Sequence, residues 1–160
     1  MSKGLLIREE PPNQPDVLAV LAACDAFSAA LYLPESNHGL DLMALLQPKA
    51  TFLVARGGGA ALGCVALVRG NGSGDGEVKS MFVDDAARGT GVGRALLTTV
   101  EERARSRDLA ALRLETGIHQ HAALGLYRTA RYRAIGPSGD YRPDPLSVFM
   151  EKRLTTTEML

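Results

Sequence analysis

The sequence predicts one α/β domain with a mixed central sheet of about seven strands and about four helices. The chain has 160 residues, of which 46% are hydrophobic, enough for one sizeable core. Strand-like and helix-like patterns follow one another along most of its length. Three consecutive strands form a meander, and a helix then leads to another strand, which is typical of a parallel crossover.

The first 50 residues predict one strand and two helices. Leu5–Arg8 has the composition of a short strand. Asn13 is a candidate helix cap with Pro15 in the first turn, and apolar residues then recur at helical spacing until Pro34 ends the helix. Leu40–Leu46 predicts a second, shorter helix.

The meander is predicted from strand formers separated by glycine-rich turns. Thr51–Ala55 and Leu62–Val68 flank three glycines at positions 57–59, which is a hairpin signal. The segment Asn71–Gly76 is a second turn, and it leads into the strand Glu77–Val83.

The second half of the chain alternates helices with strands. The predicted helices are Gly91–Ser106 and Gln120–Ala130, and the predicted strands are Ala111–Glu115, Tyr132–Ile135 and Ser147–Glu151. We assign residues 1–154 to the domain and residues 155–160 to a C-terminal tail.

Composition excludes several functional classes. Lys+Arg and Asp+Glu both number 18, so bulk charge does not draw the chain to nucleic acid or to a membrane surface. Cys24 and Cys64 lie in apolar stretches and predict buried, reduced thiols, and no cluster suggests a metal site. We find neither a signal peptide nor a membrane span, which predicts a cytoplasmic protein.

The segment Arg88–Arg94, R-G-T-G-V-G-R, carries the strongest functional signal. It lies between a predicted strand and a predicted helix, and its glycines leave the backbone accessible. Free N–H groups at a helix start, together with the helix dipole, form an anion site that suits phosphate.

Three phosphate-binding patterns compete for this loop. A P-loop requires Lys-Ser or Lys-Thr after the glycines, and neither occurs. A dinucleotide fingerprint matches only in part: five residues separate the strand from the first glycine, and Arg94 replaces the third glycine, although Glu115 lies roughly where a ribose-binding acid belongs.

The third pattern fits. The run R-G-T-G-V-G-R-A-L-L, preceded by M-F-V-D, resembles the acetyl-CoA loop of the GNAT (GCN5-related) N-acetyltransferases, whose signature Q/R-x-x-G-x-G/A matches at Arg88, Gly91 and Gly93. The resemblance continues to A-x-x-L-Y at residues 123–127 and covers essentially the whole domain, which is similar to an uncharacterised bacterial subgroup. The chain has Gln120 where the family usually has Asn, and Arg131-Tyr132 where it usually has Gly-Phe.

The resemblance implies the GNAT fold, with a V-shaped splay between the strands near 77–83 and 111–115, and acetyl-CoA as acyl donor without a metal. Main-chain groups near Phe82 and Val83 would bond the pantetheine arm and polarise the thioester carbonyl. The implied cofactor-binding residues are these two with Arg88, Gly89, Thr90, Gly91, Val92, Gly93, Arg94, Gln120 and Tyr127.

The resemblance also implies roles in catalysis. Tyr127 would donate a proton to the leaving thiolate, and Glu77 would take a proton from the amine, directly or through water, with Glu115 as the alternative base. Neither cysteine lies beside a predicted base or helix start, which favours direct transfer over a covalent acetyl-enzyme.

The predicted acceptor is a primary amine of a small molecule or peptide. Its candidate contacts are Glu35, Asn37, His38 and Tyr141. A homodimer through the last strands is a further expectation from the family. After an acetyltransferase, the second candidate function is a non-catalytic module that binds CoA or acyl-CoA, and the third is a dinucleotide-binding fragment.

Overall fold

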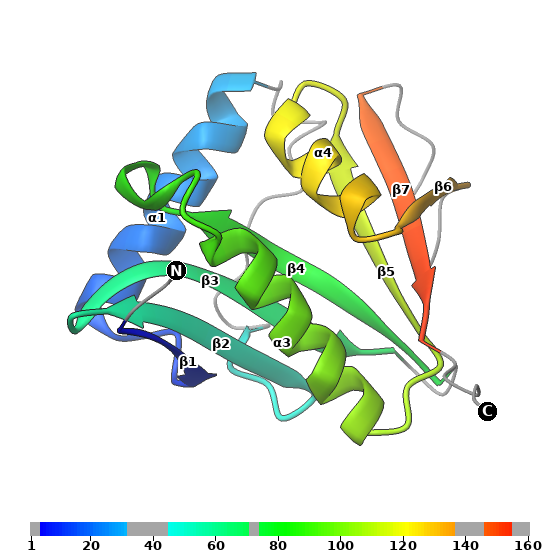
Figure 1. The fold of residues 1–160 in the computed structure, drawn as a ribbon, viewed down its shortest axis with the longest axis horizontal. Helices are drawn as coiled ribbons and strands as arrows, with labels where there is room; N and C mark the ends of the chain where they lie inside the picture. The colour runs from blue at the N-terminus through cyan, green and yellow to red at the C-terminus, as the bar shows by residue number, and fades with distance from the viewer. Residues whose placement is uncertain (1–3, 32–44, 71–73, 137–145, 155–160) are drawn as a thin grey trace.

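The computed structural model describes residues 4–31, 45–70, 74–136 and 146–154, which form a seven-stranded mixed sheet with helices on both faces (Figure 1). The sheet order is β1-β2-β3-β4-β5-β7-β6, and only the β4–β5 pair is parallel. The strands are β1 (Leu5–Glu9), β2 (Ala50–Gly57), β3 (Ala60–Arg69), β4 (Asp75–Val83), β5 (Ala111–Gly117), β6 (Arg133–Ile135) and β7 (Ser147–Arg153). The described α-helices are α1 (Pro15–Leu31), α3 (Val92–Ser106) and α4 (His121–Thr129), and a short 3₁₀ helix, η2, covers Asp85–Ala87.

Two apolar cores lie on opposite faces of the sheet. On one face α3 and α4 pack against the strands, and Leu96 and Val100 of α3 are fully buried there. On the other face Val17, Val20 and Leu21 of α1 pack against β2 and β3. The spacing of these apolar residues at three and four positions places each set on one side of its helix, which holds the helix against the sheet.

The predicted fold class is confirmed, with small differences in detail. The described residues contain three α-helices rather than about four, and most of the predicted helix Leu40–Leu46 lies outside them. The first helix starts at Pro15, and its first bond runs from the Leu18 N–H to the Gln14 carbonyl at 2.8 Å. The capping position therefore falls on Gln14 rather than on Asn13.

The predicted splay between β4 and β5 is present. Only Asp75, Gly76 and Glu77 pair with β5, opposite residues 111–113. Beyond Glu77 the two strands diverge: in Figure 1 they lie together at the lower right and separate toward the top. Main-chain groups of β4 on this side therefore have no partner in β5, and the sheet is open where the predicted site lies.

An extra residue in β4 accompanies the splay. Ala66 pairs with Lys79 and Cys64 pairs with Phe82, so two steps along β3 match three steps along β4. Ser80 is part of this β-bulge and has a φ of 58°. Side chains normally alternate between the faces of a strand, and the extra residue shifts that alternation by one position.

The shift is visible in the packing of β4. Val78 belongs to the core on the α3 side, and so do Met81 and Val83, whereas Phe82 packs against the core on the α1 side. Without an extra residue, Val78 and Met81 would face opposite sides of the sheet. The bulge therefore determines which β4 side chains face α1 at the open end of the sheet.

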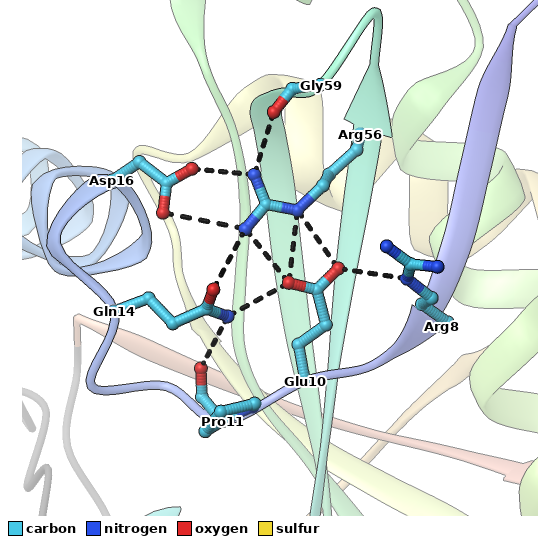
Figure 2. A network of polar contacts seen from close by, with 7 residues as sticks. All are labelled: Arg8, Glu10, Pro11, Gln14, Asp16, Arg56 and Gly59. Carbon is cyan, nitrogen blue, oxygen red and sulfur yellow. Dashed lines mark hydrogen bonds and ion pairs between the residues drawn. The ribbon is translucent and has the colours of Figure 1, made fainter.

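A polar network fixes the start of α1 to the β2–β3 hairpin (Figure 2). The Arg56 guanidinium donates to both Glu10 carboxylate oxygens, to Asp16 Oδ2 at 2.6 Å and to the Gly59 carbonyl at 2.9 Å. The hydrogen bond from Arg56 lowers the pKa of Glu10 to about 2, against the opposing effect of burial. Since α1 forms one wall of the cavity described below, this network positions a wall of the site.

Candidate functional site

A cavity of about 800 Å³ lies at the open end of the β4–β5 pair. It is lined by the middle of α1, by β4 from Glu77 to Val83, by the loop between β4 and α3, by the end of β5 and by α4. The cavity is large enough for an elongated, drug-sized or larger ligand. It brings together nearly all the predicted cofactor residues, which come from two separate segments of the chain, 82–94 and 120–127.

The glycine loop that lines the cavity has the geometry of an anion site. Gly89 and Gly91 have φ values of 79° and 90°, a conformation that L-residues with a side chain rarely adopt. Helix α3 begins at Val92 after Gly91, and no side chain caps it. The N–H groups of the first turn are therefore available to a ligand, and the first turn carries no acidic residue that would oppose an anion.

The third glycine of the loop has a different role. Gly93 lies within the first turn of α3, and a Cβ built on it would come within 3.3 Å of the Leu126 side chain and 3.5 Å of the Val83 side chain. Its small size thus lets α3 approach α4 and β4 closely. The loop needs glycine for conformation at Gly89 and Gly91 and for packing at Gly93.

The Arg88 side chain contacts α1 and β4 as well as its own loop. Its guanidinium lies 5.2 Å from the ring centroid of Phe27 on α1 and 5.5 Å from that of Phe82 on β4. Its Nε donates to the Val83 carbonyl at 3.3 Å and lies 3.6 Å from a carboxylate oxygen of Asp85. Arg88 therefore links the loop to α1 through cation–π contacts, while Arg94 is exposed at the edge of the cavity.

Tyr127 lies on α4 and lines the cavity although it is only 5% exposed. Its ring packs edge-to-face against Tyr132, with centroids 5.7 Å apart. Burial raises the pKa of the Tyr127 phenol, so the hydroxyl stays protonated at neutral pH. A fixed, protonated hydroxyl in the cavity can act as a proton donor.

Two carboxylates line the cavity from different strands. Glu77 is the last β4 residue paired with β5, its side chain is 28% exposed, and it lies 3.9 Å from Lys79 Nζ. Glu115 lies near the end of β5, where it accepts a hydrogen bond from the hydroxyl of Ser147. Both can exchange a proton with a ligand in the cavity, and Glu77 lies at the point where the strands part.

The segment before α4 also lines the cavity. Gln120 Oε1 accepts hydrogen bonds from Thr116 Oγ1 at 2.6 Å and from the Gly117 N–H at 3.1 Å, which ties the start of α4 to the end of β5. His119 and His121 flank it and also line the cavity. The amide nitrogen of Gln120 is thus the part of this side chain left to face a ligand.

Cys24 lines the cavity from α1. Burial, with a smaller contribution from the charge of Asp25, raises the pKa of its thiol to about 11. The thiol is protonated at neutral pH and lacks the thiolate character of a nucleophile. The four predicted acceptor contacts, Glu35, Asn37, His38 and Tyr141, lie outside the described residues.

Some features of the site region were not predicted from the sequence. They are the left-handed conformation of Ser80 within the β4 bulge, the buried network in which Glu101 accepts from Tyr132 Oη at 3.0 Å and from Lys152 Nζ at 2.9 Å, and the bonds of Arg113 to Asp75 and Glu151. Only Glu101 could have been noticed in the sequence, because it places an acidic residue among the apolar positions of α3.

Two kinds of feature are absent from the described residues. Within the described ranges, no three His, Cys, Asp or Glu side chains are grouped so that they could hold a metal ion. None of the helices seen in those ranges has the length and hydropathy needed to cross a membrane.

Comparison with known proteins gives consistent matches. Residues 20–131 match the model of the Acetyltransferase (GNAT) family. An IAA acetyltransferase of Azospirillum brasilense is 47% identical over 94% of this chain and 99% of its own length. The N-acetyltransferase YsnE of Bacillus subtilis is 37% identical over 76% of this chain and 81% of its own length. A solved structure of an acyl-CoA N-acyltransferase from Klebsiella pneumoniae is 40% identical, covers 94% of this chain and 97% of its own, and superposes with a TM-score of 0.79.

Proposed function

The chain belongs to the GNAT family and is an acetyl-CoA-dependent N-acetyltransferase, and we propose which of its residues bind acetyl-CoA and which transfer protons. The observation that carries the proposal is the position of the parted β4–β5 pair beside an uncapped helix start, within one cavity. The first can bond a chain of amides and the second can bind a diphosphate, and CoA contains both groups.

The cofactor would enter with its pyrophosphate on the N–H groups of the loop Arg88–Arg94. Its pantetheine arm would then run along β4, because the groups of Phe82 and Val83 that face β5 have no partner in that strand. An amide of this stretch would hold the thioester carbonyl oxygen. Gln120 would contact the arm from the opposite wall through its amide nitrogen.

We assign the proton transfers to Glu77 and Tyr127. The acceptor ammonium gives one proton to Glu77, and its nitrogen then attacks the carbonyl carbon, so that a C–N bond forms and the carbonyl electrons move to oxygen. When the carbonyl reforms, the C–S bond breaks and the sulfur leaves with its electron pair. The sulfur takes a proton from Tyr127, and the proton released by the new amide nitrogen restores the phenol through solvent.

The buried position of Tyr127 suits this role. A phenol with a raised pKa is a weak acid, but the thiolate leaves into the same cavity, and desolvation raises the proton affinity of both groups. The protonated Cys24 thiol supports direct transfer rather than an acetyl-cysteine intermediate.

The acceptor class is the less defined part of the proposal. Charged side chains of both signs also line the cavity, namely Asp25, Lys49, Glu77 and Lys79. This mixture suits a small molecule or peptide with a primary amine and a second polar group. Because the Azospirillum relative is called an IAA acetyltransferase, IAA belongs in the acceptor panel.

A cytoplasmic location and a homodimer belong to the same proposal. In the described sheet the three-residue strand β6 lies at one edge, beside β7 only, and a second copy could extend the sheet there. Light scattering on the purified protein measures the oligomeric state directly.

Two measurements test the function. Calorimetric titration with acetyl-CoA is expected to give a dissociation constant in the micromolar range. A thiol-release assay with amines, amino acids, peptides and IAA is expected to release CoA with at least one acceptor. No binding of acetyl-CoA would contradict the whole assignment, whereas binding without release on any acceptor would favour a non-catalytic module.

A further inference from the structure

Ser80 has a backbone conformation that serine seldom adopts. Its φ of 58° places it in the left-handed region, where the Cβ of an L-residue crowds the following carbonyl. Glycine is the usual residue at this position of such a bulge, because it has no Cβ. The β-bulge that accompanies the splay between β4 and β5 therefore contains a side chain that destabilises it.

The Ser80 hydroxyl adds a second unfavourable feature. Its oxygen is buried and has no hydrogen-bond partner among the described residues. The main-chain carbonyl of the same residue does have one, since it accepts from Cys64 Sγ at 3.3 Å. Buried hydroxyls in folded proteins are nearly always paired, and an unpaired one weakens the fold.

Glycine would remove both unfavourable features without altering the bulge. Stability alone thus gives no reason for serine at this position. Strained residues and unpaired buried polar groups concentrate where a ligand supplies the missing interaction. Ser80 lines the same cavity as Tyr127, and it lies between Glu77, where the strands separate, and Phe82.

We propose that the Ser80 hydroxyl donates a hydrogen bond to the acyl carbonyl oxygen of the bound thioester, as a second donor beside the main chain of β4. Rotation about χ1 among three staggered positions turns the hydroxyl without moving the backbone. As the C–N bond forms, the carbonyl oxygen gains negative charge and the hydrogen bond strengthens; it weakens again when the C–S bond breaks. Ser80 keeps its proton throughout, so the proton balance still involves Glu77 and Tyr127 alone.

The inference rests on the proposed function, and its test begins with the wild-type protein so that the two can fail separately. If the wild-type protein binds acetyl-CoA and releases CoA, the function stands and Ser80 can be tested on its own. The test compares Ser80→Ala, which removes the hydroxyl and keeps the strained Cβ, with Ser80→Gly, which removes both.

Stability and activity are expected to change in opposite directions. Thermal unfolding should rank Ser80→Gly above Ser80→Ala and Ser80→Ala above the wild type. The value of kcat should fall by about 10- to 100-fold in both variants, because one oxyanion donor is lost. Calorimetry should show weaker binding of acetyl-CoA by both variants and unchanged binding of CoA, which has no acyl carbonyl.

Two results would overturn the proposal. If both variants keep the wild-type kcat and the wild-type preference for acetyl-CoA over CoA, the hydroxyl does not contact the acyl group. If Ser80→Ala unfolds at a lower temperature than the wild type, the hydroxyl stabilises the fold, and the reason for assigning it to a ligand is lost.

Discussion

The two ends of the β4–β5 pair differ in almost every physical respect. At the closed end three residues of each strand pair, and the Arg113 guanidinium lies 3.1 Å from Asp75 Oδ2 while its Nε donates to Glu151 Oε2 at 2.9 Å. One side chain thereby links β4, β5 and β7. Gly76 packs so tightly at this end that a Cβ would approach the Leu67 and Leu109 side chains within 3.0 Å.

At the open end the same strands do not pair. The bulge interrupts the pairing of β4 with β3, a serine takes a left-handed conformation, and the start of α3 has no cap. Interactions that fold the chain are thus concentrated at one end, and unsatisfied groups at the other. One strand pair can thus supply rigidity at its closed end and room for a candidate active site at its open end.

The sharpest test at the open end is Tyr127→Phe. Loss of the hydroxyl should lower kcat by about 100-fold or more, because the leaving thiolate loses its proton donor. The apolar ring remains, so calorimetry should give nearly the wild-type affinity for acetyl-CoA. An unchanged kcat would remove Tyr127 from the chemistry.

Tyr132→Phe is the matched control for that variant. It keeps the ring that packs on Tyr127 but removes the hydrogen bond to Glu101, which still accepts from Lys152. This should reduce the free energy of unfolding by about 1 kcal/mol, with kcat nearly unchanged. A loss of kcat equal to that of Tyr127→Phe would assign the effect to packing of the two rings instead.

At the closed end, Arg113→Met is expected to affect stability rather than chemistry. It leaves the carboxylates of Asp75 and Glu151 without this partner, and their side chains are only 14% and 9% exposed. Because Arg113 itself is 35% exposed, the loss in unfolding free energy should be about 2 kcal/mol, below that of a fully buried pair. Urea unfolding measures it.

The exposed Arg153 on β7 provides the control. Arg153→Met removes an arginine from the adjoining strand whose side chain shows no ion pair within the described residues, so stability should barely change. If Arg113→Met instead left stability intact and abolished acetyl-CoA binding, the division between a structural and a functional end would be wrong.

Much of the fold could be predicted because local pattern and global packing agree. The helix Gly91–Ser106 was predicted from apolar spacing and a glycine start, and the structure has it at Val92–Ser106. Glycine repeats similarly located the meander turns. The loop Arg88–Arg94 was found for the same reason, since the residues of this candidate anion site are contiguous in sequence.

The features that escaped prediction depend on contacts between distant segments. Nothing near Ser80 in the sequence indicates a left-handed residue, because the bulge follows from the pairing of β4 with β3 and from the divergence of β5. The partners of Arg56 at Glu10 and Asp16 lie 46 and 40 residues away in the chain. Charged residues of this kind look like ordinary surface positions until the fold brings them together.

The smallest expected effect concerns the loop at the open end. Gly91 has a φ of 90° immediately before α3, and a Cβ there would meet no atom within 4 Å. Gly91→Ala therefore introduces conformational strain without a clash, about 1–2 kcal/mol, and should weaken acetyl-CoA binding by about 5- to 30-fold as the loop relaxes away from its anion-binding shape.

Gly125→Ala separates this effect from a general response to adding a methyl group. Gly125 is exposed on α4, its Cβ would also meet nothing within 4 Å, and its backbone is helical, so alanine should stabilise the helix by about 0.5–1 kcal/mol and leave the affinity unchanged. Calorimetric titration of both variants with acetyl-CoA makes the comparison. Equal affinities would mean that the loop does not need the left-handed conformation at Gly91 to bind its ligand. Anion binding at the open end would then depend on the start of α3 alone.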